Sequence, residues 1–132
     1  MNITFKALWI GSLVGATLLV TQPVRADDWN KKTEFTFSEP VEVPGHVLPA
    51  GKYVFELPDS SSERNVVEIF SEDPNGKESL IATLLTIPDH MDQTPDEPVV
   101  KFNERPSGSP EPIHSWFYPG ENTGWEFIYP KQ

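Results

Sequence analysis

Proline placement is the strongest constraint on how this chain can fold. Thirteen of its 14 prolines lie between Pro40 and Pro130, so few stretches are long enough for a helix of ordinary length. In the same region, apolar side chains never recur at helical spacing over three turns. The one exception that the pattern allows is a single helical turn over residues 111–115. We therefore expect an all-β fold.

Short segments that alternate polar and apolar residues predict the strands. In segment 34–38, for example, Phe35 and Phe37 share one face. Segment 80–87 is the most continuous apolar run, and we expect it to form the central strand. The expected strands cover residues 34–38, 40–44, 52–57, 66–70, 80–87, 99–104, 116–118 and 125–129. Their number and length predict a single antiparallel β-sandwich, immunoglobulin-like or a related small barrel.

Turn residues predict one hairpin and one long loop. Pro74, Asn75 and Gly76 separate segments 66–70 and 80–84, and these are residue types that turns favour. We expect the two segments to pair, with a bulge at Gly76. Residues 88–98 contain three prolines and four acidic side chains, which predicts an exposed crossover loop.

The N-terminal segment has the pattern of a secretory signal peptide. It begins with one positive charge, continues with an apolar run over 7–20, and places small side chains at Val24 and Ala26. The alternative is a membrane anchor, but about 14 helical residues span roughly 21 Å, less than the ~30 Å hydrocarbon core. We expect a signal peptide over 1–26, then a β-sandwich domain over 27–132. The cleaved protein would be periplasmic or secreted, with no membrane insertion.

Composition argues against several classes of function. Residues 27–132 carry 8 basic and 20 acidic side chains, and such a surface repels nucleic-acid backbones and anionic membranes. The chain has no cysteine, which excludes a disulfide scaffold, a thiolate zinc site and a cysteine nucleophile. No serine lies in a Gly-x-Ser-x-Gly elbow. We expect no enzymatic activity and no cofactor.

Metal binding is not signalled by residue spacing. His46, His90 and His114 each stand alone in separate segments, so a zinc site would have to assemble in space with aspartate or glutamate. The sequence shows no preference for such a site. The four acids of residues 89–97 lack the spacing of a calcium loop, and the prolines among them restrict how that loop could wrap an ion. We expect no metal and a solvated acidic loop.

One local motif carries a resemblance. The sequence LPAGKY at residues 48–53 joins two predicted strands. This Leu-Pro-Ala-Gly-x-Tyr pattern resembles a group of uncharacterised small secreted bacterial β domains, and the likeness extends over most of residues 27–132. It implies a single exported β domain and no particular activity, ligand or catalytic residue. By turn chemistry alone, Pro49 fixes a turn, Gly51 adopts a conformation that other residues avoid, and Tyr53 points inward.

Aromatic residues near the C-terminus supply the one sharp binding hypothesis. Trp116 and Tyr118 share one face of their segment, and Trp125 shares a face with Phe127 and Tyr129. One of these two faces must fill the core. If the other is exposed, it forms a platform on which sugar rings could stack, whereas two inward faces would be the ordinary use of aromatics in a sandwich.

Two functional hypotheses follow. The first is an exported, non-enzymatic structural or interaction module of the cell envelope that binds a protein partner or a surface polymer. It would pair along an edge strand, with segment 35–38 or 125–129 as the edge. The alternative is a carbohydrate-binding module that uses Trp116, Tyr118 and Trp125.

Overall fold

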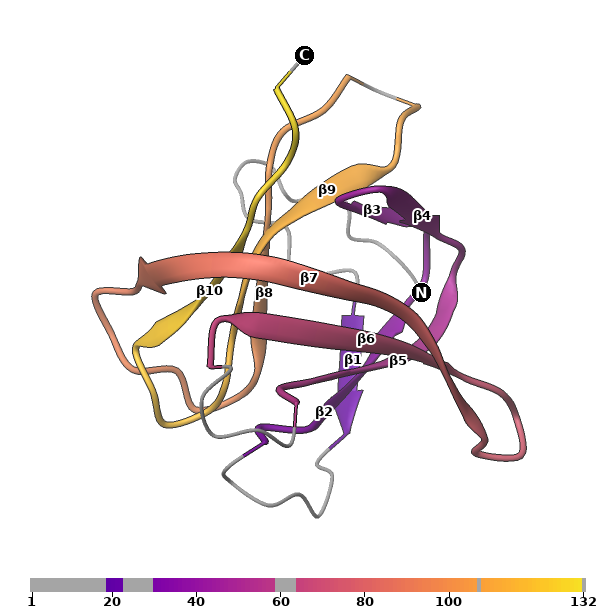
Figure 1. Ribbon diagram of the computed structural model, residues 1–132, viewed down its shortest axis with the longest axis horizontal. Helices are drawn as coiled ribbons and strands as arrows, with labels where there is room; N and C mark the ends of the chain where they lie inside the picture. The colour runs from indigo at the N-terminus through magenta and orange to yellow at the C-terminus, as the bar shows by residue number, and fades with distance from the viewer. Residues whose placement is uncertain (1–18, 23–29, 59–63, 107, 132) are drawn as a thin grey trace.

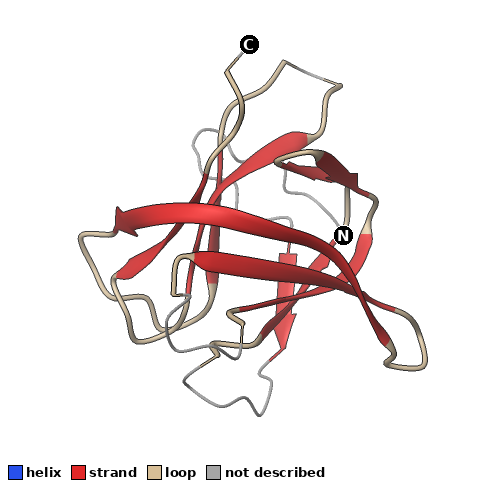
Figure 2. Cartoon of the chain, viewed as in Figure 1, coloured by secondary structure: helices blue, strands red, loops and turns tan. Residues whose placement is uncertain are grey.

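The computed structural model describes residues 19–22, 30–58, 64–106 and 108–131. Within these ranges the protein is all-β and contains no helix (Figure 1, Figure 2). The predicted cleavage point after Ala26 lies outside the described residues. No helix that could cross a membrane occurs in the described part of the chain. The strands are β1 Leu19–Gln22, β2 Thr33–Phe37, β3 Val41–Val43, β4 His46–Leu48, β5 Gly51–Glu56, β6 Val66–Glu72, β7 Glu78–His90, β8 Val99–Phe102, β9 Glu111–Phe117 and β10 Thr123–Phe127.

The strands form one mostly antiparallel sheet that bends over on itself. Its order is β1-β2-β5-β6-β7-β10-β9-β3-β4, and β8 pairs with β9 outside this path. The 13-residue β7 connects the two halves, because it pairs with β6 on one side and β10 on the other (Figure 1). The sheet is not closed into a barrel. The predicted all-β, sandwich-like architecture is confirmed, with one continuous sheet supplying both layers.

Three details of this sheet differ from what the sequence predicts. Residues 111–115 belong to β9 and form no helical turn. Most of β9 is buried and it pairs with β8, β10 and β3, so tertiary packing overrides the local signal. The pairing of β9 with β3 is parallel, within a sheet that is otherwise antiparallel as expected. In addition, Pro88, Asp89 and His90 lie in β7, so the crossover loop begins later than predicted.

Alternation along the strands places large side chains between the layers. β2 buries every second residue, and β5 contributes Phe55, which is completely buried. The Phe55 ring lies 5.0 Å from Phe35 and 5.6 Å from Trp116, both in edge-on contact, and 6.3 Å from Phe127. β7 is central as predicted, but its outer face is exposed, with Leu85 64% accessible. The core is therefore an aromatic cluster centred on Phe55 and contributed by strands of both layers.

The predicted hairpin is confirmed. The whole of β6 pairs with residues 78–85 of β7, and the connecting loop is closed by Asp73, whose carboxylate accepts two backbone hydrogen bonds at 2.9 Å. Gly76 has a φ of +85°, the left-handed conformation expected of it. The Gly76 amide donates to the Asp73 carbonyl at 2.8 Å and the Asp73 amide donates to the Lys77 carbonyl at 3.0 Å, so Gly76 and Lys77 together oppose Asp73, as the predicted bulge requires. A further register shift lies between Ile69 and Phe70. It offsets the pairing in the middle of the hairpin.

The LPAGKY segment acts as a turn between β4 and β5. Tyr53 is buried, as predicted, and its hydroxyl donates a hydrogen bond to the Pro49 carbonyl at 2.5 Å. Burial raises the pKa of Tyr53 above its ordinary value. Tyr53 therefore ties β5 back to the turn that precedes it.

A second tyrosine fastens the C-terminal segment to the sheet. The Tyr129 hydroxyl donates to the Ile113 carbonyl at 2.6 Å and lies 3.1 Å from the Glu42 carbonyl. Burial, reinforced by the charge of Glu42, raises the pKa of Tyr129 far above its ordinary value. Its contacts therefore join β3 and β9 to the chain end.

The raised pKa of Tyr129 predicts loss of stability in alkali. Above about pH 10 the unfolded chain releases the phenolic proton and the folded chain keeps it, so the free energy of unfolding falls. The slope for one such tyrosine is at most about 1.4 kcal/mol per pH unit. Tyr129→Phe should flatten this decline and lower stability near neutral pH by about 1 kcal/mol. Urea unfolding at several pH values measures both effects, and an unchanged alkaline slope in the variant would contradict the assignment.

Candidate functional site

Trp116 lies in the core and not on the surface. Its side chain is completely buried, in edge-on contact with Phe55 and stacked at 4.6 Å against Trp125. A buried ring has no free face for a sugar. The interpretation that Trp116 contributes to an exposed aromatic platform is therefore wrong, because both halves of the folded sheet close over its side chain.

Trp125 and Tyr118 are half-buried. The Trp125 indole nitrogen donates to the Arg64 carbonyl at 2.9 Å, and its ring is held by the stack on Trp116. Tyr118 lies under the ammonium of Lys31, whose nitrogen is 5.1 Å from the ring centroid. Of the three predicted platform residues, the structure therefore joins Trp116 and Trp125 into one stack, and Tyr118 faces a cation.

A hollow of about 310 Å³ lies beside Trp125. It is lined by Lys31 and Glu121, which form an ion pair, together with Thr86, Ile87 and further residues from neighbouring segments. An aromatic side chain next to charged and polar groups could receive a small polar molecule. The hollow is open to solvent, and its one described aromatic side chain is already committed to another ring and to a hydrogen bond.

The outer edge of β2 is a second candidate site. β1 pairs antiparallel with β2 there, with Leu19 opposite Phe37 and Gln22 opposite Glu34. β1 belongs to the segment predicted to be a signal peptide, so removal of that segment would leave β2 as the edge of the sheet. Phe35 and Phe37 face the core and Glu34 and Thr36 are half-exposed, which leaves the backbone as the principal contact surface along this edge.

The prediction that segment 125–129 forms an edge strand is wrong. Segment 125–129 overlaps β10, and β10 lies between β7 and β9, paired with both. Its backbone groups are therefore engaged on both sides. The alternation that places Phe127 in the core is the same for an edge strand and an interior strand, so sequence could not distinguish them.

Charged side chains lie close to the β2 edge. A side-chain hydrogen bond that the protonated carboxyl of Glu72 on β6 donates to Glu34 raises the pKa of Glu72, and burial and the charge of Glu34 act in the same direction. The cations Lys52 and Lys32 oppose this effect. Lys32 also pairs with Glu78 at 3.2 Å. The rim of this part of the sheet is thus a mixed ionic surface.

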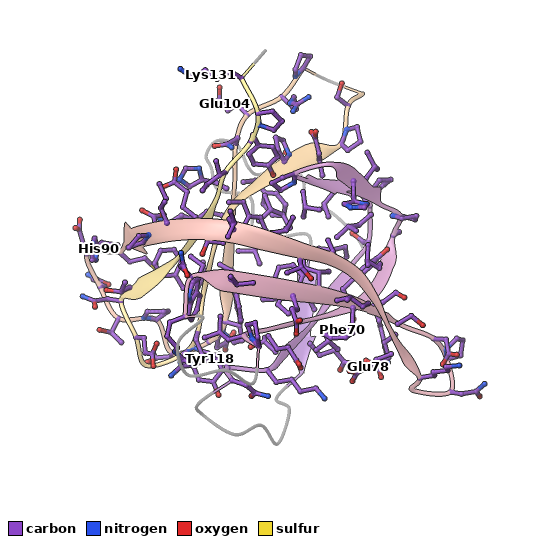
Figure 3. The ribbon with its side chains drawn as sticks, in the orientation of Figure 1. Phe70, Glu78, His90, Glu104, Tyr118 and Lys131 are labelled. Carbon is purple, nitrogen blue, oxygen red and sulfur yellow. The ribbon has the colours of Figure 1, made fainter. Side chains whose placement is uncertain are left out.

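A third candidate combines residues from four strands. Lys101 of β8 pairs with Asp89 of β7 at 3.9 Å, and the imidazole of His114 on β9 lies 3.7 Å from Asp89 and 3.8 Å from Glu126 of β10. Sequence could not group them, because it predicts a loop around Asp89 and places His114 in a separate segment. His46 and His90 are elsewhere and exposed, with His90 at the end of β7 (Figure 3). Of the acids predicted to form a solvated loop, Asp92, Asp96 and Glu97 are exposed.

No protein-family model, curated protein or solved structure matches this chain. Its function therefore has to be inferred from the geometry of the described residues. Of the three candidates, the β2 edge is the one on which the structure already seats another segment, and that segment is an extended strand.

Proposed function

We propose that the protein is an exported, non-enzymatic interaction module of the cell envelope. Its β2 edge accepts an extended segment of another envelope protein, which adds a strand to the sheet. The observation that supports this function is the pairing of β1 with β2 over four residues. An edge that takes up a strand from the predicted signal segment offers free donors and acceptors to a different strand once that segment is gone.

The chemistry of the edge favours a protein over a polymer. Strand addition is driven by main-chain hydrogen bonds at the spacing of a polypeptide, which a polysaccharide lacks. Residues 27–132 have an excess of acidic side chains, and Glu34 is half-exposed on β2 itself. A partner segment with basic side chains would be attracted to such a surface. The carbohydrate alternative has less support, because Trp116 is buried and Trp125 is stacked on it.

Disulfide trapping tests strand addition at β2. Val20 lies opposite Thr36, and facing residues in antiparallel strands are about 4.5–5.5 Å apart, within the range that a disulfide spans. The protein, expressed from its full sequence and purified after export, would carry Thr36→Cys and no other cysteine. A synthetic peptide of residues 17–24 with Val20→Cys is the probe. We expect a covalent adduct at position 36 under mild oxidation.

The controls separate strand addition from chance reaction. Glu68→Cys lies on β6, which is flanked by β5 and β7, and should trap at least about tenfold less peptide. An N-methylated peptide, which cannot donate main-chain hydrogen bonds, should also fail. Gln22→Lys in the peptide, opposite Glu34, should increase trapping relative to Gln22→Glu. Equal trapping at positions 36 and 68, or a covalent homodimer that excludes the peptide, would contradict the proposal.

A further inference from the structure

We propose that Asp89, His114 and Glu126 form a binding site for a divalent transition-metal ion such as zinc. One oxygen or nitrogen from each lies within 4.8 Å of the others. The three side chains come from β7, β9 and β10, which are neighbours in the sheet, so rigid backbone holds them together. This site is separate from the β2 edge and does not depend on the proposed function.

A bulge in β9 directs His114 into the cluster. Lys101 of β8 pairs with Ser115, and the next residue, Phe102, pairs with Ile113, so His114 is an extra residue on its strand. If β9 alternated strictly and had no bulge, His114 would lie on the same face as the buried Trp116, two residues further along. A β-bulge redirects a side chain in this way. The imidazole thereby reaches the face on which Glu126 lies.

The distances suit tetrahedral coordination. The His114 Nε2 atom lies 3.7 Å from Asp89 Oδ2 and 3.8 Å from Glu126 Oε1. Ligand atoms at about 2.0–2.2 Å from a tetrahedral zinc are about 3.3–3.6 Å apart. The two His114 contacts would shorten by a few tenths of an ångström, and the Asp89 and Glu126 oxygens, which lie within 4.8 Å of each other, would approach by at most about 1.5 Å. Each side chain is 20–33% accessible, which leaves room for water as a fourth ligand.

Asp89 is oriented toward the site. Its Oδ1 atom accepts a hydrogen bond from the His90 backbone amide at 2.9 Å, which fixes the carboxylate plane. Its Oδ2 atom is inaccessible to solvent and accepts no hydrogen bond from any described residue. A carboxylate oxygen in this condition is destabilised unless a cation neutralises it. The unpartnered atom is the one that faces His114.

Lys101 supplies a positive charge close to the unpartnered oxygen of Asp89. Its ammonium lies 3.9 Å from Asp89 Oδ2, beyond hydrogen-bond distance, and 5.0 Å from the centroid of the Phe117 ring. A dication bound to Asp89 would repel it. The flexible lysine can withdraw its ammonium toward solvent. Lys101 is therefore expected to compete with the metal ion.

The ligand set selects the class of metal. Imidazole nitrogen with carboxylate oxygens suits zinc and its transition-metal neighbours. Calcium requires six to eight oxygens, and magnesium prefers an octahedral shell of oxygens, so neither is satisfied by this set. Zinc ion is accordingly the probe, and calcium is the comparison that should fail.

Zinc titration of the full protein, followed by calorimetry and by thermal unfolding, tests the site. We expect one equivalent to bind and to raise the unfolding temperature. His114→Ala and Glu126→Gln should each weaken binding at least about tenfold. Lys101→Met should strengthen it, by about threefold to fivefold, because it removes the competing charge. His46→Ala removes an exposed histidine on β4 and should leave binding unchanged.

The opposite effects of the variants keep the test decisive even if one variant folds poorly. If the wild-type protein binds no zinc at millimolar zinc concentration, the proposal is overturned. The four side chains would then contact only one another. Equal losses in His46→Ala and His114→Ala would show non-specific binding and also overturn it. Weaker binding in Lys101→Met would contradict the competing role of the lysine.

Discussion

Gly124→Ala should destabilise the protein by crowding two neighbouring strands. A Cβ atom at position 124 would overlap the Trp116 carbonyl oxygen and would lie 2.7 Å from the Phe117 ring. The carbonyl belongs to the neighbouring strand and cannot move aside without disturbing the β9–β10 pairing. We expect the free energy of unfolding to fall by about 3 kcal/mol or more, measured by urea denaturation.

Gly120→Ala is the matched control. Gly120 has a φ of +85° and nothing within 4 Å of the added atom, so its cost is conformational strain of about 1–2 kcal/mol. Gly124 is not among the glycines with positive φ, so its cost is steric crowding. If Gly124→Ala is the milder of the two substitutions, then β9 and β10 do not approach each other this closely.

Gly124 also helps to form the surface on which Asp89, His114 and Glu126 meet. Its missing side chain leaves space for the Phe117 ring, and the ammonium of Lys101 lies near that ring. Gly124 is opposite Asp89 in the β7–β10 pair, two residues from Glu126. One glycine thus lets an aromatic ring support the face on which the proposed metal ligands meet.

Side-chain alternation is a local property, and it was enough to predict most strands. The patterns around Phe35, Phe37 and Tyr53 predict side chains that point inward, and the structure confirms their burial. The turn residues near Gly76 likewise specify which two segments pair. All of these signals are contained within about ten residues of chain, which is why sequence alone conveys them.

Strand order and the polar cluster depend on contacts that are distant in sequence. Nothing in segment 125–129 indicates that β10 inserts between β7 and β9. The grouping of Asp89, His114 and Glu126 requires that order, and it also requires the extra residue in β9. The burial of Trp116 depends on closure of the two layers, which the alternation of its own segment leaves open. These features arise from the assembled sheet, so no local pattern reports them.

Phe55→Ala should remove a large share of the stability, because Phe55 is where the two layers meet. Its ring contacts Phe35 from its own layer, and Trp116 and Phe127 from the other. Loss of a fully buried phenylalanine costs about 3–5 kcal/mol, against a total of about 5–15 kcal/mol for a typical domain. We expect a lower urea midpoint with an unchanged slope, if folding stays cooperative.

Two variants give this expectation its control. Phe70→Ala changes the same residue type on the adjacent β6, where the side chain is half-buried, and should cost about 1 kcal/mol. Phe55→Leu retains much of the apolar volume and should recover about half of the loss. If Phe55→Ala and Phe70→Ala were equally destabilising, the core would not be centred on Phe55. The layers would then be held together chiefly by the strand pairing that continues through β7.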